Sequence, residues 1–312
     1  MKLLFKIETG RSEGRVEGDV AMINKKKSFK KFDSSFFAST LTEEKRTVMD
    51  FTSEGTSAMN ALTRYLEENG FNQGYIKCSS GIVSDLRYAF FLTKHKPYPT
   101  FAYALLKGRN QVISLSGFFL PLRSQIDPTQ KSIVPHLHIV FRSLEDGRVY
   151  SGHFVDAEKA DLRIEVVQLS GGELKRDIDP NTGLMYLRAR AAKKKRRNKE
   201  NFLIFAVGQN ESFPDELLKR IKSYNNVTSG EYEFAVGTLW SARLKNTEQE
   251  HIINPREGME LSYTEGEIVL EKEKTRHHTK VTLIDRFGRS HSGHLLSGRV
   301  KDLVEGVLKL RP

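Results

Sequence analysis

Apolar residues recur at helical spacing in only a few places along the chain, and the first of these follows a strand-like run at residues 47–51. From Met59 to Leu66 the apolar positions lie three or four residues apart, as they would on one face of a helix. Asn69 followed by Gly70 is a stop signal of the kind found at helix ends. The spacing therefore predicts a helix over residues 56–68.

The same order of features occurs again in the second half of the chain. An apolar run at residues 202–207 leads to Ser212, which is predicted as an N-cap because Asp215 stands three residues further on. Leu217 and Ile221 then follow at helical spacing. These signals predict a second helix directly after the apolar run.

The remaining apolar runs are bounded by glycine and aspartate, which is typical of strands joined by tight turns. Runs at 112–122, 136–141 and 149–155 are separated by turn signals, of which Asp146-Gly147 is the strongest. Short connections of this kind join antiparallel strands. Together with the helices they predict an α+β fold, in which one helix covers a mostly antiparallel sheet in each half of the chain.

A seven-residue signature indicates that the chain contains an internal repeat. The segment Gly-Arg-Val-Tyr-Ser-Gly-His at 147–153 recurs as Gly-Arg-Ser-His-Ser-Gly-His at 288–294, and residues 136–138 align without a gap with residues 277–279. Similarity of this kind predicts two tandem copies of one domain. We place a basic N-terminal segment at 1–45, the first copy at 46–170, a basic linker at 171–199 and a second, divergent copy at 200–312.

Charge and cysteine content narrow the class of protein. The formal net charge of +11 favours polyanionic partners such as nucleic acid. The single cysteine, Cys78, excludes an internal disulfide and is interpreted as a small buried hydrophobe. The chain shows neither a signal peptide nor a run of about 18 apolar residues. We therefore expect a cytoplasmic protein without a membrane partner, nucleoid-associated in a bacterium or nuclear in a eukaryotic cell.

The first copy resembles the plant-and-prokaryote conserved (PPC) domain, also called domain of unknown function 296. Four motifs carry the resemblance in the same order: Gly81-Ile82-Val83-Ser84-Asp85, Gly108-Arg109 with 112–117, His136-Leu137-His138, and 146–153. The resemblance implies an α/β sandwich that assembles as a trimer, so that two copies per chain would give a trimer or pseudo-hexamer. Plant members of the family carry AT-hook peptides and act in the nucleus, and prokaryotic members are described as predicted DNA-binding proteins. The chain has no AT-hook core.

Three histidines of the first copy form a candidate metal site. His136 and His138 lie two residues apart on a predicted strand and so share one face, and a hairpin partner can bring His153 beside them. Three imidazoles with an open fourth position are typical of zinc sites that activate water, and Zn²⁺ is the cofactor that this pattern favours. The alternative is a set of hydrogen-bonded histidines that stabilise a sheet or a subunit interface.

The second copy is expected to lack this site. In the ungapped alignment Thr279 takes the middle position, which leaves His277 and His294, while His278 would face the other way on a regular strand. Any metal chemistry is therefore expected in the first copy.

Basic residues near the linker form a candidate nucleic-acid site. Clusters of Lys and Arg neutralise phosphates and bind nucleic acid with little sequence preference. The alternative is a solvated spacer between the two copies. The candidate residues are Arg188, Arg190, Lys193, Lys194, Lys195, Arg196 and Arg197.

A third candidate is a short segment at the position where plant family members contact other proteins. It comprises Gly108, Arg109, Val112 and Ile113, and a turn at the start of a strand is the simpler interpretation. No nucleophile elbow, P-loop or dinucleotide fingerprint stands in a suitable context. We therefore expect a non-enzymatic, nucleic-acid-associated or regulatory protein whose basic arms contact DNA or RNA. The alternative is a metal- or small-ligand-binding oligomer that uses the three histidines.

Overall fold

Long apolar–polar alternation makes strands the dominant element of this fold. The computed structural model describes residues 36–55, 57–95, 98–123, 131–178, 185–191, 201–224, 227–246, 249–255, 258–271, 275–285 and 287–312. Within these ranges the chain forms two helices, of 11 and 7 residues, and is otherwise mostly strand. The predicted α+β class is therefore wrong. The prediction gave one helix in each half the same importance as the strands, but the strands continue far beyond the apolar runs from which they were predicted.

Two helices and fifteen strands follow one another along the described part of the chain. The helices are α1 (Ala58–Glu68) and α2 (Asp215–Ile221). The strands of the first half are β1 (Phe36–Ser53), β2 (Gly74–His95), β3 (Tyr98–Arg123), β4 (Lys131–Ser143), β5 (Val149–Asp156) and β6 (Lys159–Ser170). A separate hairpin comprises β7 (Gly172–Ile178) and β8 (Met185–Ala191). The strands of the second half are β9 (Asn201–Gly208), β10 (Ser212–Phe213), β11 (Ser229–Lys245), β12 (Glu250–Ile253), β13 (Met259–Leu270), β14 (Thr275–Asp285) and β15 (Ser290–Arg311).

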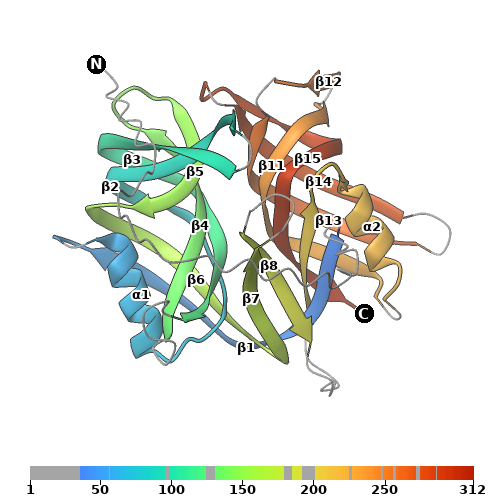
Figure 1. Ribbon diagram of the computed structural model, residues 1–312, viewed down its shortest axis with the longest axis horizontal. Coiled ribbons are helices and arrows are strands. Elements are labelled where there is room, and N and C mark those ends of the chain that lie inside the picture. The colour runs from blue at the N-terminus through green and yellow to red at the C-terminus, as the bar shows by residue number, and fades with distance from the viewer. Residues whose placement is uncertain are drawn as a thin grey trace, which may run out of the picture.

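One antiparallel sheet of thirteen strands runs through both halves, in the order β12-β11-β13-β14-β15-β9-β1-β6-β2-β3-β4-β5 with β10 paired to β15. In the first half β2 also pairs with β5, and in the second half β11 also pairs with β15, so the strands curl back on themselves. Helices α1 and α2 lie on opposite outer sides of the molecule, and the β7–β8 hairpin lies between the halves (Figure 1). The predicted antiparallel strands are thus confirmed.

Helix α1 agrees closely with its prediction. Ser57 caps it by accepting a hydrogen bond from the Asn60 backbone N–H at 3.1 Å, and its hydroxyl donates to Asp156 at 2.8 Å. Leu62 and Leu66 are buried against the sheet. This helix forms where periodicity and capping signals coincide.

Helix α2 begins later than its sequence suggests. Ser212 lies in the short strand β10, where its hydroxyl donates to Asp215 at 2.6 Å, and Pro214 occupies the N-cap position. The predicted Ser212 cap is therefore wrong. The Ser212–Asp215 pair instead closes the turn that leads into the helix.

Three apolar clusters hold the sheet in shape. One packs α1 on the first half, a second packs α2 on the second half, and a third joins the two halves. In the third cluster the rings of Phe118 and Phe234 lie 5.0 Å apart, and those of Tyr75 and Phe202 lie 6.1 Å apart. Cys78 is free and buried, as expected.

Strand β1 also connects the two halves, through backbone pairing with strands of both. It pairs with β6 through residues Thr42–Ser53 and with β9 through residues Phe36–Thr42, so it belongs to both halves of the sheet. It also begins well before the predicted run at 47–51. The division into two tandem domains remains a prediction, and residues 1–35 and 192–200 lie outside the described part of the chain.

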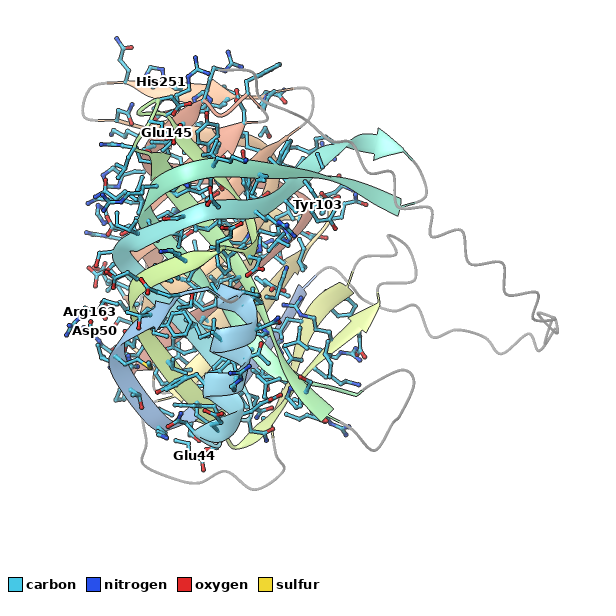
Figure 2. All side chains as sticks on the ribbon, turned by 90° about the vertical axis from the view of Figure 1, so that its left-hand side faces the viewer. Glu44, Asp50, Tyr103, Glu145, Arg163 and His251 are labelled. Carbon is cyan, nitrogen blue, oxygen red and sulfur yellow. The ribbon has the colours of Figure 1, made fainter. Side chains whose placement is uncertain are left out.

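Two surface features of the first half are visible in Figure 2. Tyr103 stands on the long β2–β3 pair, which extends away from the body of the sheet, and Arg163 lies beside Asp50 on the outer surface at 3.3 Å. In the described residues no helix has the length and apolar character needed to span a membrane.

Candidate metal centre

Strand alternation places the three histidines on one face of the sheet. In β4, Leu137 and Ile139 point into the apolar core, so His136 and His138 point the other way, toward the second half. In the register between β4 and β5, His138 stands directly opposite His153. The hairpin therefore assembles the group from two neighbouring strands.

The three imidazoles converge. One nitrogen from each ring can be chosen so that all three lie within 4.8 Å of one another, and among the described residues this is the one such group of three or more potential ligands. His136 Nε2 lies 3.0 Å from His153 Nδ1, and the rings of His138 and His153 are 4.3 Å apart. The His138 side chain is 4% exposed, whereas that of His136 is 32% exposed, so the group is open on the His136 side.

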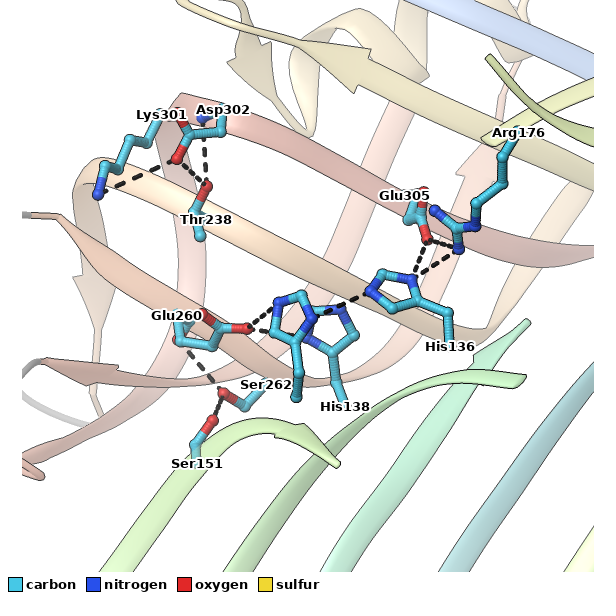
Figure 3. Close-up of polar contacts among 11 residues, drawn as sticks. His136, His138, Ser151, Arg176, Thr238, Glu260, Ser262, Lys301, Asp302 and Glu305 are labelled. Atoms are coloured by element: carbon cyan, nitrogen blue, oxygen red, sulfur yellow. Dashed lines mark hydrogen bonds and ion pairs between the residues drawn. The ribbon is translucent and has the colours of Figure 1, made fainter. Parts of the chain in front are cut away.

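A carboxylate from the second half stands directly behind two of the rings. Glu260 of β13 places Oε1 2.8 Å from His138 Nδ1 and 3.8 Å from His153 Nε2 (Figure 3). Nearby, the hydroxyls of Ser151 and Ser262 are in hydrogen-bond contact across the same interface. The candidate site therefore lies between the two halves of the chain.

The third ring is held from the β7–β8 hairpin. Arg176 Nη2 lies 2.6 Å from His136 Nδ1 and 3.1 Å from Glu305 Oε1, while Glu305 Oε1 is 3.6 Å from the same histidine nitrogen (Figure 3). The side chains of Arg176 and Glu305 are 6% and 4% exposed. A buried ion pair thus stands at the outer nitrogen of His136.

Burial sets the charge state of the histidines. It lowers the pKa of His136 and of His138 to about 4 and lowers that of His153 well below the ordinary value, with the Arg176 cation adding to the effect on His136. Burial also raises the pKa of Glu260 to about 7, whereas Arg176 holds the pKa of Glu305 far below its usual range. The three imidazoles are consequently neutral near pH 7.

These properties fit a metal ion. Neutral imidazoles offer lone pairs, three of them suit zinc, and ligating histidines usually donate their other N–H to a carboxylate. Glu260 supplies that carboxylate for His138 and faces the Nε2 of His153. His138 Nε2, His153 Nδ1 and His136 Nε2 are then the nitrogens that would bind the ion.

In the second half, strands β14 and β15 carry a different set of residues at the positions that correspond to the three histidines. Lys280 stands opposite His294 in the β14–β15 register, as His138 stands opposite His153, and the rings of His278 and His294 lie 4.3 Å apart. His277 instead contacts Thr279 at 3.2 Å. The ungapped alignment is thus wrong by one residue, because the β14–β15 turn is one residue shorter. A lysine ammonium in place of the middle imidazole disfavours a cation.

The other predicted residues lie elsewhere. Lys193–Arg197 fall outside the described residues; Arg188 pairs with Asp177 at 3.2 Å, and Arg190 is exposed on the same hairpin. Gly108 and Arg109 lie within β3 beside an irregularity in its pairing with β2, so the segment is not a turn at the start of a strand. Val112 is buried in the core and Ile113 is exposed. The partner-binding role of this segment remains a prediction.

Sequence reasoning missed Glu260, Glu305 and Arg176. Glu260 and Glu305 each interrupt an apolar stretch of a strand, as in Met-Glu-Leu at 259–261 and Val-Glu-Gly-Val at 304–307. Buried acidic residues are rare unless they are paired, so an isolated acid in a core strand is a detectable signal. Arg176 carries no comparable signal, because it stands in a linker rich in charge.

Comparison with solved structures identifies several chains that are similar to part of this one. A structure of a metal-containing protein from Archaeoglobus fulgidus is 23% identical, covers 47% of this chain and 94% of its own, and has a TM-score of 0.38. A plant- and prokaryote-conserved protein from Pyrococcus horikoshii is 20% identical, with coverages of 50% and 96% and a TM-score of 0.37. A protein from Bacteroides thetaiotaomicron, whose name assigns DNA binding provisionally, is 21% identical, with coverages of 47% and 96% and a TM-score of 0.37.

Curated proteins provide no significant match to the chain. The family model of the Plants and Prokaryotes Conserved domain matches residues 42–170, a segment that contains all three histidines and strands β2 to β6. Residues 42–170 of this chain therefore form a Plants and Prokaryotes Conserved domain.

Proposed function

We propose that this protein binds a divalent transition-metal ion, with Zn²⁺ as the best match, through His136, His138 and His153. The observation that carries the proposal is the convergence of three imidazole nitrogens within 4.8 Å on a largely buried face. A zinc ion held by three imidazoles can activate a bound water, and it can equally serve to hold strands together. The proposal is limited to binding of the ion, which both of these roles require.

Two features support a metal over a purely hydrogen-bonded cluster. The lowered pKa values keep all three rings neutral, the charge state in which an imidazole can bind a metal. The site also remains open to solvent on the His136 side, which gives an ion a path of entry.

Elemental analysis of the full chain tests the proposal. Protein purified without chelator and then exposed to Zn²⁺ should retain about one ion per chain after the excess is removed. His138→Ala should lose it, whereas His251→Ala, an exposed histidine of β12, should retain it. Sub-stoichiometric metal that is equal in all three proteins would contradict the proposal.

We also infer nucleic-acid binding by the basic linker. The net charge of +11 and the run Lys193–Arg197, which follows the exposed Arg190 of β8, support this second function. In a fluorescence-anisotropy titration, affinity should fall steeply with salt. With alanine at positions 193–197, the slope of log affinity against log salt concentration should become shallower. The change should be about 0.7–0.9 for each phosphate that the chain no longer neutralises. His138→Ala serves as the control, and absence of binding at low salt would refute the inference.

A further inference from the structure

Each histidine of the triad has a second nitrogen, and those nitrogens face groups from outside residues 42–170. Glu260 of β13 faces His138 and His153, and Arg176 of β7 faces His136. Because such outer groups decide which nitrogen carries the proton and how the ring is oriented, they affect how well the other nitrogen binds a metal. The two groups here have opposite charge.

We propose that these two residues set the metal affinity of the triad in opposite directions: Glu260 strengthens binding and Arg176 weakens it. This inference rests on the proposed function. It assigns to the second half and to the β7–β8 hairpin a role in tuning a site whose ligands all belong to the PPC domain.

Glu260 favours the ligating form of His138. When Glu260 is ionised, its Oε1, 2.8 Å from His138 Nδ1, can only accept, so the ring proton stands on Nδ1 and the Nε2 lone pair is available to an ion. The same oxygen faces His153 Nε2 at 3.8 Å, so that Nδ1 of that ring is the nitrogen turned toward the ion. The ionised form of this buried side chain in addition offsets part of the charge of a bound cation.

Arg176 favours the non-ligating form of His136. A guanidinium only donates hydrogen bonds, so His136 Nδ1 must accept at 2.6 Å and the ring proton must then stand on Nε2. That proton points toward His153 Nδ1 at 3.0 Å, the place where the ion would lie. The cation itself also repels a second cation nearby.

Glu305 is the group that would replace Arg176 as the hydrogen-bond partner of His136. It binds Arg176 at 3.1 Å and lies 3.6 Å from His136 Nδ1. Once Arg176 is removed, Glu305 can accept a hydrogen bond from Nδ1–H of His136, as Glu260 does from His138. The ring would then present Nε2 to the ion.

The test is a Zn²⁺ titration of the metal-free full chain against a chromophoric chelator at one fixed pH. Glu260→Gln should weaken binding by about 10–100-fold. Arg176→Met, which keeps the length of the side chain but removes its charge and donors, should tighten binding by about tenfold. Arg176→Lys, which keeps the charge, should tighten it less.

Matched controls come from the same strands. Glu267→Gln, further along β13, and Lys175→Met, next to Arg176 on β7, change charges at the surface and should leave the affinity within about twofold. Circular dichroism melting identifies a variant that fails to fold. If Glu260→Gln does so, Glu260→Asp replaces it and should weaken binding because the shorter side chain no longer reaches His138.

The outcomes separate the two levels of the proposal. A wild-type chain that binds no Zn²⁺ overturns both the proposed function and this inference. If the wild-type chain binds Zn²⁺ and both charge variants bind it equally tightly, the inference alone is overturned. The same holds if the two variants change the Zn²⁺ affinity in the same direction.

Discussion

At the scale of single residues, Asp285 shows how a buried carboxylate organises a turn. Its Oδ1 accepts hydrogen bonds from the backbone N–H groups of Phe287 and Arg289 at 2.9 and 3.0 Å, and Oδ2 accepts from Arg289 Nε at 2.7 Å. Burial alone would raise the pKa of this carboxyl, but these hydrogen bonds outweigh it and hold the pKa below the ordinary value. The carboxylate thus stabilises the β14–β15 turn in its ionised form.

Replacing this carboxylate should destabilise the protein in a pH-dependent manner. Asp285→Asn should lower the free energy of unfolding by about 1–3 kcal/mol near pH 7. Because the pKa is lower in the folded state, the contribution is complete above the unfolded-state pKa of about 4 and is lost as pH falls through the folded-state value. Urea titrations at several pH values should therefore show the difference from wild type shrinking in acid. Asp50→Asn, at an exposed carboxylate, is the control, and equal effects at the two positions would contradict this account.

At the scale of elements, Gly117 allows β3 and β4 to approach each other beside the triad. Its φ is +157°, and a Cβ atom there would lie 2.1 Å from the backbone oxygen of His136. Gly117→Ala should therefore cost about 2–4 kcal/mol of stability and displace the histidine strand, which weakens Zn²⁺ binding. Urea unfolding and the chelator titration measure the two effects. Gly230→Ala, whose new Cβ would have its nearest neighbour at 3.4 Å, should change neither by much, and a Gly117→Ala chain as stable as this control would refute the prediction.

Elements with local signals were predictable from the sequence, and those specified by tertiary contacts were not. Helix α1 and the Asp146-Gly147 turn follow from spacing and turn chemistry, and Gly147 N–H indeed donates to Ser143 O at 2.9 Å. The face on which His278 lies could not be predicted without the β14–β15 register. One residue fewer in the turn moves every side chain of the strand to the opposite face. Glu260 could not be connected with His138, since 122 residues separate them and the contact exists only where the halves pack together.

At the scale of the whole molecule, the two halves share backbone pairing and an apolar cluster. Strand β1 pairs with strands of both halves, and Phe118 packs on Phe234 across the boundary. Separation of the halves would expose these side chains and would leave Glu260 and Glu305 without their partners from β4 and the hairpin. The packing therefore indicates that both halves unfold together.

The single tryptophan makes this cooperativity measurable, because Trp240 lies in β11 of the second half. Leu66, a fully buried residue of α1 in the first half, belongs to a different apolar cluster. Leu66→Ala should cost about 2–5 kcal/mol and, if unfolding is cooperative, should lower the urea midpoint reported by Trp240 fluorescence. Leu217→Ala, in the cluster under α2, should lower that midpoint whether or not the halves are coupled. A Trp240 midpoint that responds to Leu217→Ala and not to Leu66→Ala would mean that the halves unfold independently, and the candidate metal site between them would then be lost as soon as one half unfolds.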